Sequence, residues 1–294
     1  TSGYRNSSKL RGRINEVEYY EPKSVLAMQA DRREEKHRRK QKKGIRAGRI
    51  LLGVAILLFW EVSARLGWID DYYWSSPSLI AQTAIIQWKE KNLAYDIYFT
   101  SMSTIGGFLA GTLGGAVLGL FFWWSKTFAK IFEPYLVMFN AIPKLALAPI
   151  LIVLFGIGFS SKVMLAFLMT VISCALATVS GVENVDESME TLLYSLGAAR
   201  WQVFGKVVVP AVLPWMLGSL RINISLALAG AIVGEFIASG HGLGRMVIYA
   251  GTILDTTLVW VGVIVLSLLA MVMYFAVVEL EKWMTEHLAI YRKA

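Results

Sequence analysis

The chain has 294 residues, a net charge of +8 and a mean hydropathy of +0.54, and 56% of its residues are hydrophobic. This composition excludes a soluble globular domain and indicates an integral membrane protein. Cys174 is the only cysteine, which excludes an intrachain disulfide and a cysteine-based metal cluster.

Six apolar runs are long enough to cross ~30 Å of hydrocarbon as helices. In chain order they cover about residues 49–67, 99–124, 128–156, 163–182, 213–238 and 258–283. The third run is interrupted by Pro134, Pro143 and Pro149. The expected fold class is therefore an all-α membrane protein with about six transmembrane helices.

Basic residues are concentrated ahead of the first span. Residues 1–49 hold 15 Lys and Arg against 6 Asp and Glu, so their net charge of +9 leaves the other 245 residues at −1. Because Lys and Arg near span ends stay cytoplasmic, the N-terminus and, with an even number of spans, the C-terminus are predicted to be cytoplasmic. The basic run 31–43 suits anionic lipid or nucleic acid, and the span that follows it favours lipid headgroups.

This interpretation divides the chain into four parts. Residues 1–48 are a basic cytoplasmic extension, and residues 49–97 hold the first transmembrane helix and an external loop. Residues 98–283 form the transmembrane core, which includes a cytoplasmic loop at 183–210, and residues 284–294 are a cytoplasmic tail.

Nothing in the sequence points to catalysis or to a metal site. His37, His241 and His287 lie far apart in the predicted topology, and none has a spacing typical of metal ligation. The chain also lacks a Gly-x-x-x-x-Gly-Lys-Ser/Thr phosphate-binding loop. If ATP drives this protein, ATP and Mg²⁺ are therefore expected on another subunit, with no cofactor in this chain.

The loop between the fourth and fifth spans is the most informative segment. After Gly197 and nine intervening residues comes Val207-x-Val209-Pro210. This pattern resembles the EAA loop of binding-protein-dependent ABC importer permeases, which docks on the ATPase subunit. Residues 139–158, 218–221, 233–235 and 239–244 also resemble segments of the nitrate, sulfonate, taurine and bicarbonate branch, and the resemblance covers about residues 50–285.

The resemblance implies a type I ABC importer permease fold and a set of ATPase-coupling residues in this loop. These are Glu187, Glu190, Thr191, Gly197, Ala198, Arg200, Lys206 and Pro210. Thr191 stands where the family pattern usually has Glu. We expect two short helical segments that meet at Gly197, with Pro210 and Pro214 preventing a continuous helix into the fifth span. An ordinary interfacial helix is the alternative.

Polar groups inside the spans are the candidates for the translocation path or its gate: Asn140, Pro143, Ser173, Arg221, Asn223 and Glu235. Arg221 and Glu235 are 14 residues apart, about 21 Å along a helix, so they cannot pair with each other. For Arg221 the options are a pair with an acidic residue, a brace for the loop, or snorkelling to headgroups. For Glu235 a structural role is favoured over contact with the solute.

Four glycines in the second span, Gly107, Gly111, Gly115 and Gly119, lie on one helix face and predict a close helix contact. Packing within the subunit is favoured over a sliding or dimer surface.

By family resemblance the chain is expected to be the permease subunit of an ATP-driven importer in the bacterial inner membrane. It would form a homodimer or a pseudo-symmetric pair in membrane lipid and bind ATPase subunits and an external substrate-binding protein, but no nucleic acid. It would move a small anionic solute of the sulfonate, taurine, nitrate or bicarbonate class inward by alternating access. The alternatives are an ATP-independent secondary transporter or channel, which would show internal repeats and an ionisable relay, and a membrane-anchored scaffold.

Overall fold

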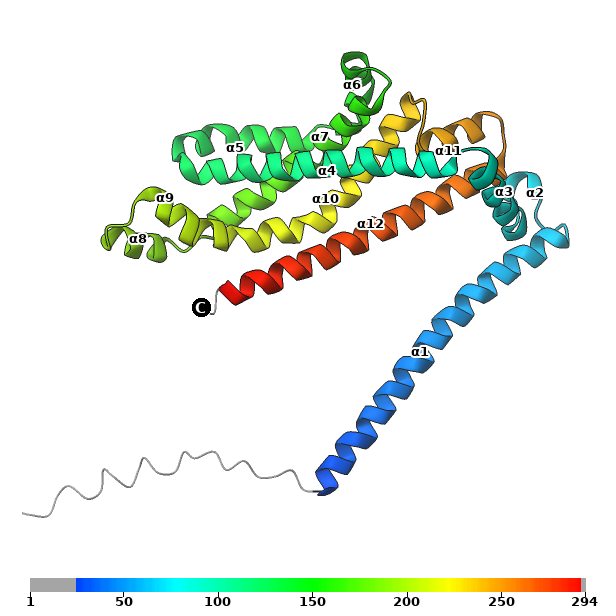
Figure 1. Ribbon diagram of the computed structural model, residues 1–294, viewed down its shortest axis with the longest axis horizontal. Coiled ribbons are helices and arrows are strands. Elements are labelled where there is room, and N and C mark those ends of the chain that lie inside the picture. The colour runs from blue at the N-terminus through cyan, green and yellow to red at the C-terminus, as the bar shows by residue number, and fades with distance from the viewer. Residues whose placement is uncertain (1–24, 292–294) are drawn as a thin grey trace, which may run out of the picture. The chain divides into compact units, whose positions relative to one another are not determined.

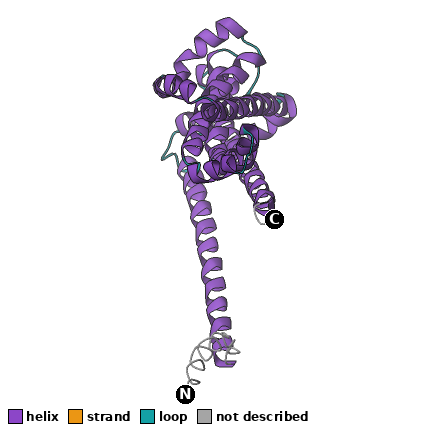
Figure 2. Ribbon diagram, turned by 90° about the vertical axis from the view of Figure 1, so that its left-hand side faces the viewer, coloured by secondary structure: helices purple, strands orange, loops and turns teal. Residues whose placement is uncertain are grey.

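The computed structural model describes the backbone of residues 25–291 and the side chains of most residues from Gly44 onward. Within the described residues the chain consists of helices and loops, with no strand (Figure 2). Residues 1–24 and 292–294, which belong to the predicted extension and tail, lie outside the described residues. The chain divides into two units, residues 1–60 and 61–294.

The first helix, α1 (Val25–Arg65), begins well before the predicted span, and its part Ala47–Arg65 is long and apolar enough to cross a membrane. Its last turn belongs to the second unit and contains the Glu61–Arg65 ion pair, with 2.7 Å between Oε1 and Nε. The other oxygen of Glu61 accepts a hydrogen bond of 3.0 Å from the N–H of Ser78. Glu61 therefore fastens the end of α1 to the start of the next long helix, α3 (Pro77–Glu90).

The rest of the second unit is a series of helices of very different lengths. They are α2 (Asp71–Trp74), α4 (Leu93–Trp124), α5 (Lys126–Ala141), the 3₁₀ turn η1 (Lys144–Leu147), α6 (Ala148–Phe155), α7 (Phe159–Glu183), α8 (Glu187–Ser195), α9 (Arg200–Val203), the π-helical turn η2 (Phe204–Val208), α10 (Val209–Ile237), α11 (Leu243–Thr252) and α12 (Thr256–Tyr291).

Five helical stretches of the described chain could each span a membrane: one in α1, then α4, α7, the stretch Arg200–Ile237 and α12. A sixth results if α5 and the following η1–α6 segment, which are bent by 83°, count as one broken span. The all-helical class with about six spans is thus confirmed. The bend lies at Pro143, and Ile142 before it is extended because a proline disfavours helical backbone in the preceding residue.

The core of the second unit is formed by α4, α7 and α10, which lie against one another (Figure 1). The predicted glycine face of α4 packs against α7. A Cβ on Gly115 would lie 2.7 Å from the Cβ of Cys174, and one on Gly107 would lie 2.8 Å from the carbonyl oxygen of Val163. Only glycine permits this backbone separation, and the contact lies within one subunit. Cys174 itself is buried between the two helices.

Candidate coupling element and transport path

We call residues Glu187–Val208, which comprise α8, α9, η2 and the turn between them, the coupling element. Asp186 caps its first helix by accepting a hydrogen bond of 2.9 Å from the N–H of Ser188. The hydrogen bonds from Ser188 lower the pKa of Asp186, so the carboxylate stays ionised at neutral pH. This cap fixes the start of α8.

Gly197 forms the turn that ends α8. Its φ of +83° lies in the left-handed region, which favours glycine over residues that carry a Cβ. The N–H of Gly197 donates to the carbonyl of Tyr194 and that of Ala198 to Leu193, both at 3.0 Å. The chain then turns into α9, where the side chain of Gln202 accepts from the N–H of Ala199 at 2.8 Å. The two short helices predicted on either side of Gly197 are α8 and α9.

The prediction that Pro210 and Pro214 would separate the coupling element from the fifth span is wrong. The stretch Arg200–Ile237 is continuously helical, and η2 joins α9 to α10. In this π turn the N–H of Val209 donates to the carbonyl of Phe204, five residues earlier. The wider turn makes room for the ring of Pro210, so the helix continues although proline cannot donate a backbone hydrogen bond.

An aromatic anchor, formed by Trp123, Trp124, Phe204 and Arg200, attaches the coupling element to the end of α4. The guanidinium of Arg200 lies 5.4 Å from the ring centroid of Trp123 and 5.1 Å from that of Trp124, and it donates to the carbonyl of Trp124. Phe204 contacts both indole rings. The sequence interpretation missed both tryptophans, because tryptophans at a span end are equally typical of an aromatic belt in the headgroups.

Three of the predicted ATPase-coupling residues have side chains that bond within the chain. The carboxylate of Glu190 accepts a hydrogen bond of 2.8 Å from the indole N–H of Trp123, and Arg200 belongs to the anchor. Thr191 donates its hydroxyl to the carbonyl of Glu187 in its own helix at 2.8 Å. Other predicted positions are exposed, namely Glu187, Gly197, Lys206 and Pro210, whereas Ala198 is half-buried.

The exposed surface of the coupling element carries large apolar side chains. Leu196 is 74% exposed and Trp201 68% exposed, and Met189 and Leu192 are exposed as well. Large apolar side chains gathered on a surface that also carries Glu187 and Lys206 are typical of a protein-docking site. These exposed apolar side chains were not among the coupling residues predicted from the sequence.

At the other end of α10, Glu235 belongs to a buried polar cluster that we call the outer clasp: Asp96, Thr100, Lys162, Glu235 and the loop 238–244. Glu235, which is 1% exposed, accepts hydrogen bonds from the hydroxyl of Thr100 at 2.9 Å and from the N–H of Gly244 at 2.7 Å. Thr100 accepts in turn from the N–H of Leu243, and Asp96 from that of Gly242. The first N–H groups of α11 therefore bond to side chains of α4 and α10, which compensates their burial.

Lys162 completes the outer clasp from α7 and is fully buried. Its amine donates to the carbonyl of Ile157 at 2.6 Å and to the carbonyl of Ala238. The lysine thus joins the chain after α6 to the chain after α10. Sequence inspection showed no sign of this role, because a lysine near a span end usually reaches the headgroups. Glu235 and Lys162 are hydrogen-bonded to protein groups.

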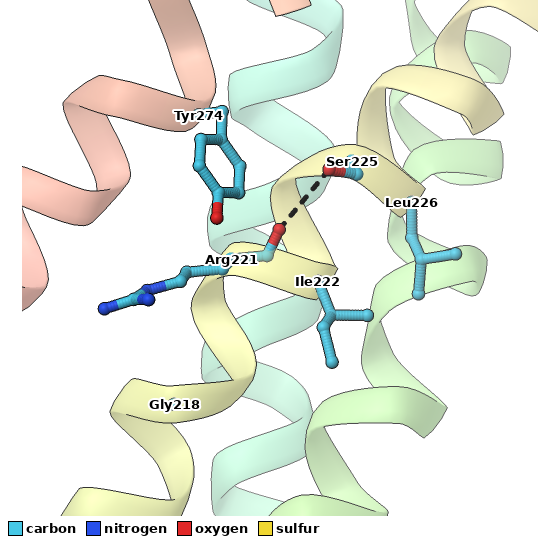
Figure 3. A pocket seen from close by; sticks show the side chains of 6 residues that line it. All are labelled: Gly218, Arg221, Ile222, Ser225, Leu226 and Tyr274. Atoms are coloured by element: carbon cyan, nitrogen blue, oxygen red, sulfur yellow. Dashed lines mark hydrogen bonds between the residues drawn. The ribbon is translucent and has the colours of Figure 1, made fainter. Parts of the chain in front are cut away.

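One face of α10 is not covered by other described helices, and we call it the path face: Gly218, Ile222, Ser225 and Ala229, with Arg221 at its edge. Arg221 pairs with Glu281 of α12, with 2.5 Å between Nε and Oε2 and 3.0 Å between Nη2 and Oε1. A groove of about 540 Å³ lies here, lined by Gly218, Arg221, Ile222, Ser225, Leu226 and Tyr274 (Figure 3). A second groove of about 370 Å³ flanks Gly218 and Ile222 on the side of Trp215.

The six predicted path residues do not converge on this groove. Arg221 lines it, whereas Asn223 is buried and bonds Ser219 of its own helix at 3.3 Å. Ser173 is half-buried in α7. Asn140 and Pro143 lie in the bent segment, where the amine of Lys144 donates to Asn140 at 3.2 Å.

Comparison with known proteins identifies this architecture. Residues 107–286 match the family described as "binding-protein-dependent transport system inner membrane component". The chain belongs to this family. The match includes the coupling element and the path face, so this chain is a permease subunit of an ABC importer and a multi-pass protein of the bacterial inner membrane.

Named relatives agree with this membership. The formylaminopyrimidine transport permease protein of Halalkalibacterium halodurans is 31% identical over 236 residues, which are 79% of this permease and 92% of the relative. The taurine transport system permease protein of Escherichia coli is 32% identical over 60% of this permease and 64% of its own length. A solved structure of the methionine transporter MetNI, facing inward, shares the fold: the TM-score is 0.57 at 17% identity, over 65% of this permease and 94% of that chain.

Proposed function

We propose that this permease works as a homodimer that carries an ATPase subunit on each coupling element and receives an anionic solute from an external binding protein. Both termini of the chain lie in the cytoplasm, and alternating access moves the solute inward. ATP and Mg²⁺ are bound and consumed on the ATPase subunits. The contributions of this chain are the docking surface, the moving helices and the path.

The observation that carries the proposal is the exposed apolar surface of the coupling element. Leu192, Leu196 and Trp201 face outward, while Arg200 and Glu190 hold the element against α4 through the aromatic anchor. A partner that buries these side chains gains a large apolar contact, at about 25 cal/mol per Å². An ATP-independent transporter has no need of such a surface.

The continuous helix from Arg200 to Ile237 gives a route for movement from the ATPase to the path. Its first turns belong to the coupling element, and its middle carries the path face with Gly218 and Ile222. Because no loop separates the two, a displacement of the docking surface is passed on along a helix of 38 residues. The π turn at Phe204–Val208 is the point where this helix can bend.

A solute that carries an anionic group is supported by Arg221 on the path face and by the relative named for taurine transport, since taurine carries a sulfonate. The relative named for formylaminopyrimidine transport supports a neutral solute instead. Because Arg221 is a cation, we favour the solute with an anionic group.

The test of the proposal uses Gly197. Gly197→Asp combines a side chain at φ +83° with a charge on the docking surface, so we expect it to reduce co-purification of the ATPase subunit at least tenfold from native membranes in mild detergent. Gly205→Ala is the matched control, because Gly205 lies in the same element with open space for a Cβ and no positive φ. Gly197→Asn should retain more ATPase than Gly197→Asp, since asparagine tolerates left-handed backbone.

Two results would contradict the proposal. One is a wild-type chain that purifies without any ATPase subunit, which would favour the secondary transporter. The other is full co-purification and coupled uptake with Gly197→Asp, which would remove the docking role from the coupling element.

A further inference from the structure

The position of Arg221 in a span requires an explanation beyond its ion pair. Its side chain is 42% exposed, although it lies in the first half of the fifth span predicted at residues 213–238. Because a guanidinium avoids hydrocarbon, this edge of α10 faces water, headgroups or protein. The groove beside it measures about 540 Å³, which is within the usual range for small-molecule sites.

The hydrogen bonds of Arg221 leave one edge of its guanidinium open. A guanidinium carries five N–H donors in a planar fork. The Nε and one N–H of Nη2 are used by Glu281, which therefore occupies the inner edge. The outer edge, formed by Nη1 and the second N–H of Nη2, can hold two oxygens of a carboxylate or sulfonate. Tyr274 brings its hydroxyl to the same groove (Figure 3).

We propose that this groove is a subsite of the transport path for an oxyanionic group, which binds the outer edge of Arg221 while Glu281 holds the inner edge. The proposal deepens the function proposed above and rests on it for the identity of the path. The oxyanion contacts Arg221 and Tyr274, and the apolar remainder of the solute lies against Ile222 and Leu226.

Glu281 has two effects in this arrangement. Its two hydrogen bonds fix the plane of the guanidinium, so that little side-chain entropy is lost when an anion binds. Its negative charge also opposes the charge of Arg221, which keeps the affinity for an anion low. A transport site needs such low affinity, because the solute has to leave after it has entered.

The subsite can be tested with charged thiol reagents, without knowledge of the natural solute. Ser225→Cys places a thiol in the groove, and Ala229→Cys places one on the next turn of the same exposed face, outside the groove lining. Cys174, the only cysteine in the sequence, is buried, so the unsubstituted chain gives the background rate of modification. The rates of modification by an anionic reagent, 2-sulfonatoethyl methanethiosulfonate, and by a cationic trimethylammonium analogue are measured in proteoliposomes on the full chain, together with any subunits that co-purify with it.

We expect the anionic reagent to be favoured about tenfold in Ser225→Cys relative to Ala229→Cys, because the charge of Arg221 raises the local concentration of anions. Adding Arg221→Gln should abolish this preference, and adding Glu281→Gln should increase it. Ethanesulfonate at millimolar concentration should slow the anionic reagent in Ser225→Cys. The opposite effects of the two Gln variants separate a binding role from a structural one, because loss of an ion pair that is only structural would affect both variants alike.

The same ratio of anionic to cationic rates in Ser225→Cys and Ala229→Cys, or a preference that persists in Arg221→Gln, would overturn the subsite. Absence of reaction with either reagent would also overturn it, because it would show that lipid covers the groove. These outcomes are independent of ATPase binding, so a failed subsite and a failed importer assignment are told apart by the Gly197 experiment.

Discussion

The two ends of α10 are attached to the rest of the protein in different ways. At the outer clasp, Glu235 and Lys162 are almost fully buried, and their hydrogen bonds reach α4, α11 and the chain that follows α6. At the inner end, the coupling element is attached by ring contacts and by the exposed guanidinium of Arg200. Buried charges are costly to separate, whereas an exposed cation–π contact contributes about 0.5–1 kcal/mol.

This difference suits a helix that acts as a lever, fixed at one end and displaced at the other. The outer clasp holds α4, α7, α10 and α11 as one body, because each of its hydrogen bonds joins two of these elements or their connecting chains. The inner end can be displaced by a partner at a much smaller cost. The path face lies between the two ends, so movement of the inner end would change the groove at Arg221 most and the outer clasp least.

The largest effect on stability is expected from Glu235→Ala. The substitution leaves the N–H of Gly244 and the hydroxyl of Thr100 without their acceptor inside the buried cluster. We expect a loss of about 3 kcal/mol in the free energy of unfolding, measured by thermal unfolding in detergent. Glu279→Ala is the control, because that carboxylate is 71% exposed and its pair with Lys282 contributes only about 0.3–0.5 kcal/mol. A similar melting temperature for the two variants would contradict the description of the outer clasp.

Much of the fold could be predicted from the sequence, because hydropathy and proline positions act locally. The long apolar runs predicted the spans, and Pro143 predicted the break that the structure places between α5 and η1. The prediction that Pro210 ends the helix was wrong, because the π turn before it accommodates the ring, and no local sequence pattern indicates such a turn. The hydrogen-bond partners of Arg221 and Lys162 could not be predicted from the sequence either, since Glu281 is 60 residues from Arg221 and Ala238 is 76 residues from Lys162 along the chain.

A second prediction tests the close packing of α4 against α7. Gly115→Ala would bring a Cβ to 2.7 Å from the Cβ of Cys174 and 2.9 Å from the backbone nitrogen of Ala175, so one helix has to move. We expect a loss of about 1–3 kcal/mol. In Gly114→Ala the nearest atom is 3.5 Å away, on the ring of Phe167, and stability should stay the same or rise slightly because alanine favours helix. Equal unfolding curves for these adjacent substitutions would show that α4 and α7 are not in close contact.

The smallest effect on stability is expected from Trp123→Phe at the inner end. It removes the hydrogen bond to Glu190 and weakens the stacking of Arg200, for a loss of about 1 kcal/mol or less. Hydrogen exchange should nevertheless accelerate at the amides of Gly197 and Ala198, because the anchor no longer holds the turn. Trp201→Phe, at a position that is 68% exposed, should leave this exchange unchanged. If Trp123→Phe destabilised the protein as much as Glu235→Ala, the two ends of α10 would be equally fixed, and the inner end could not act as the moving end of the lever.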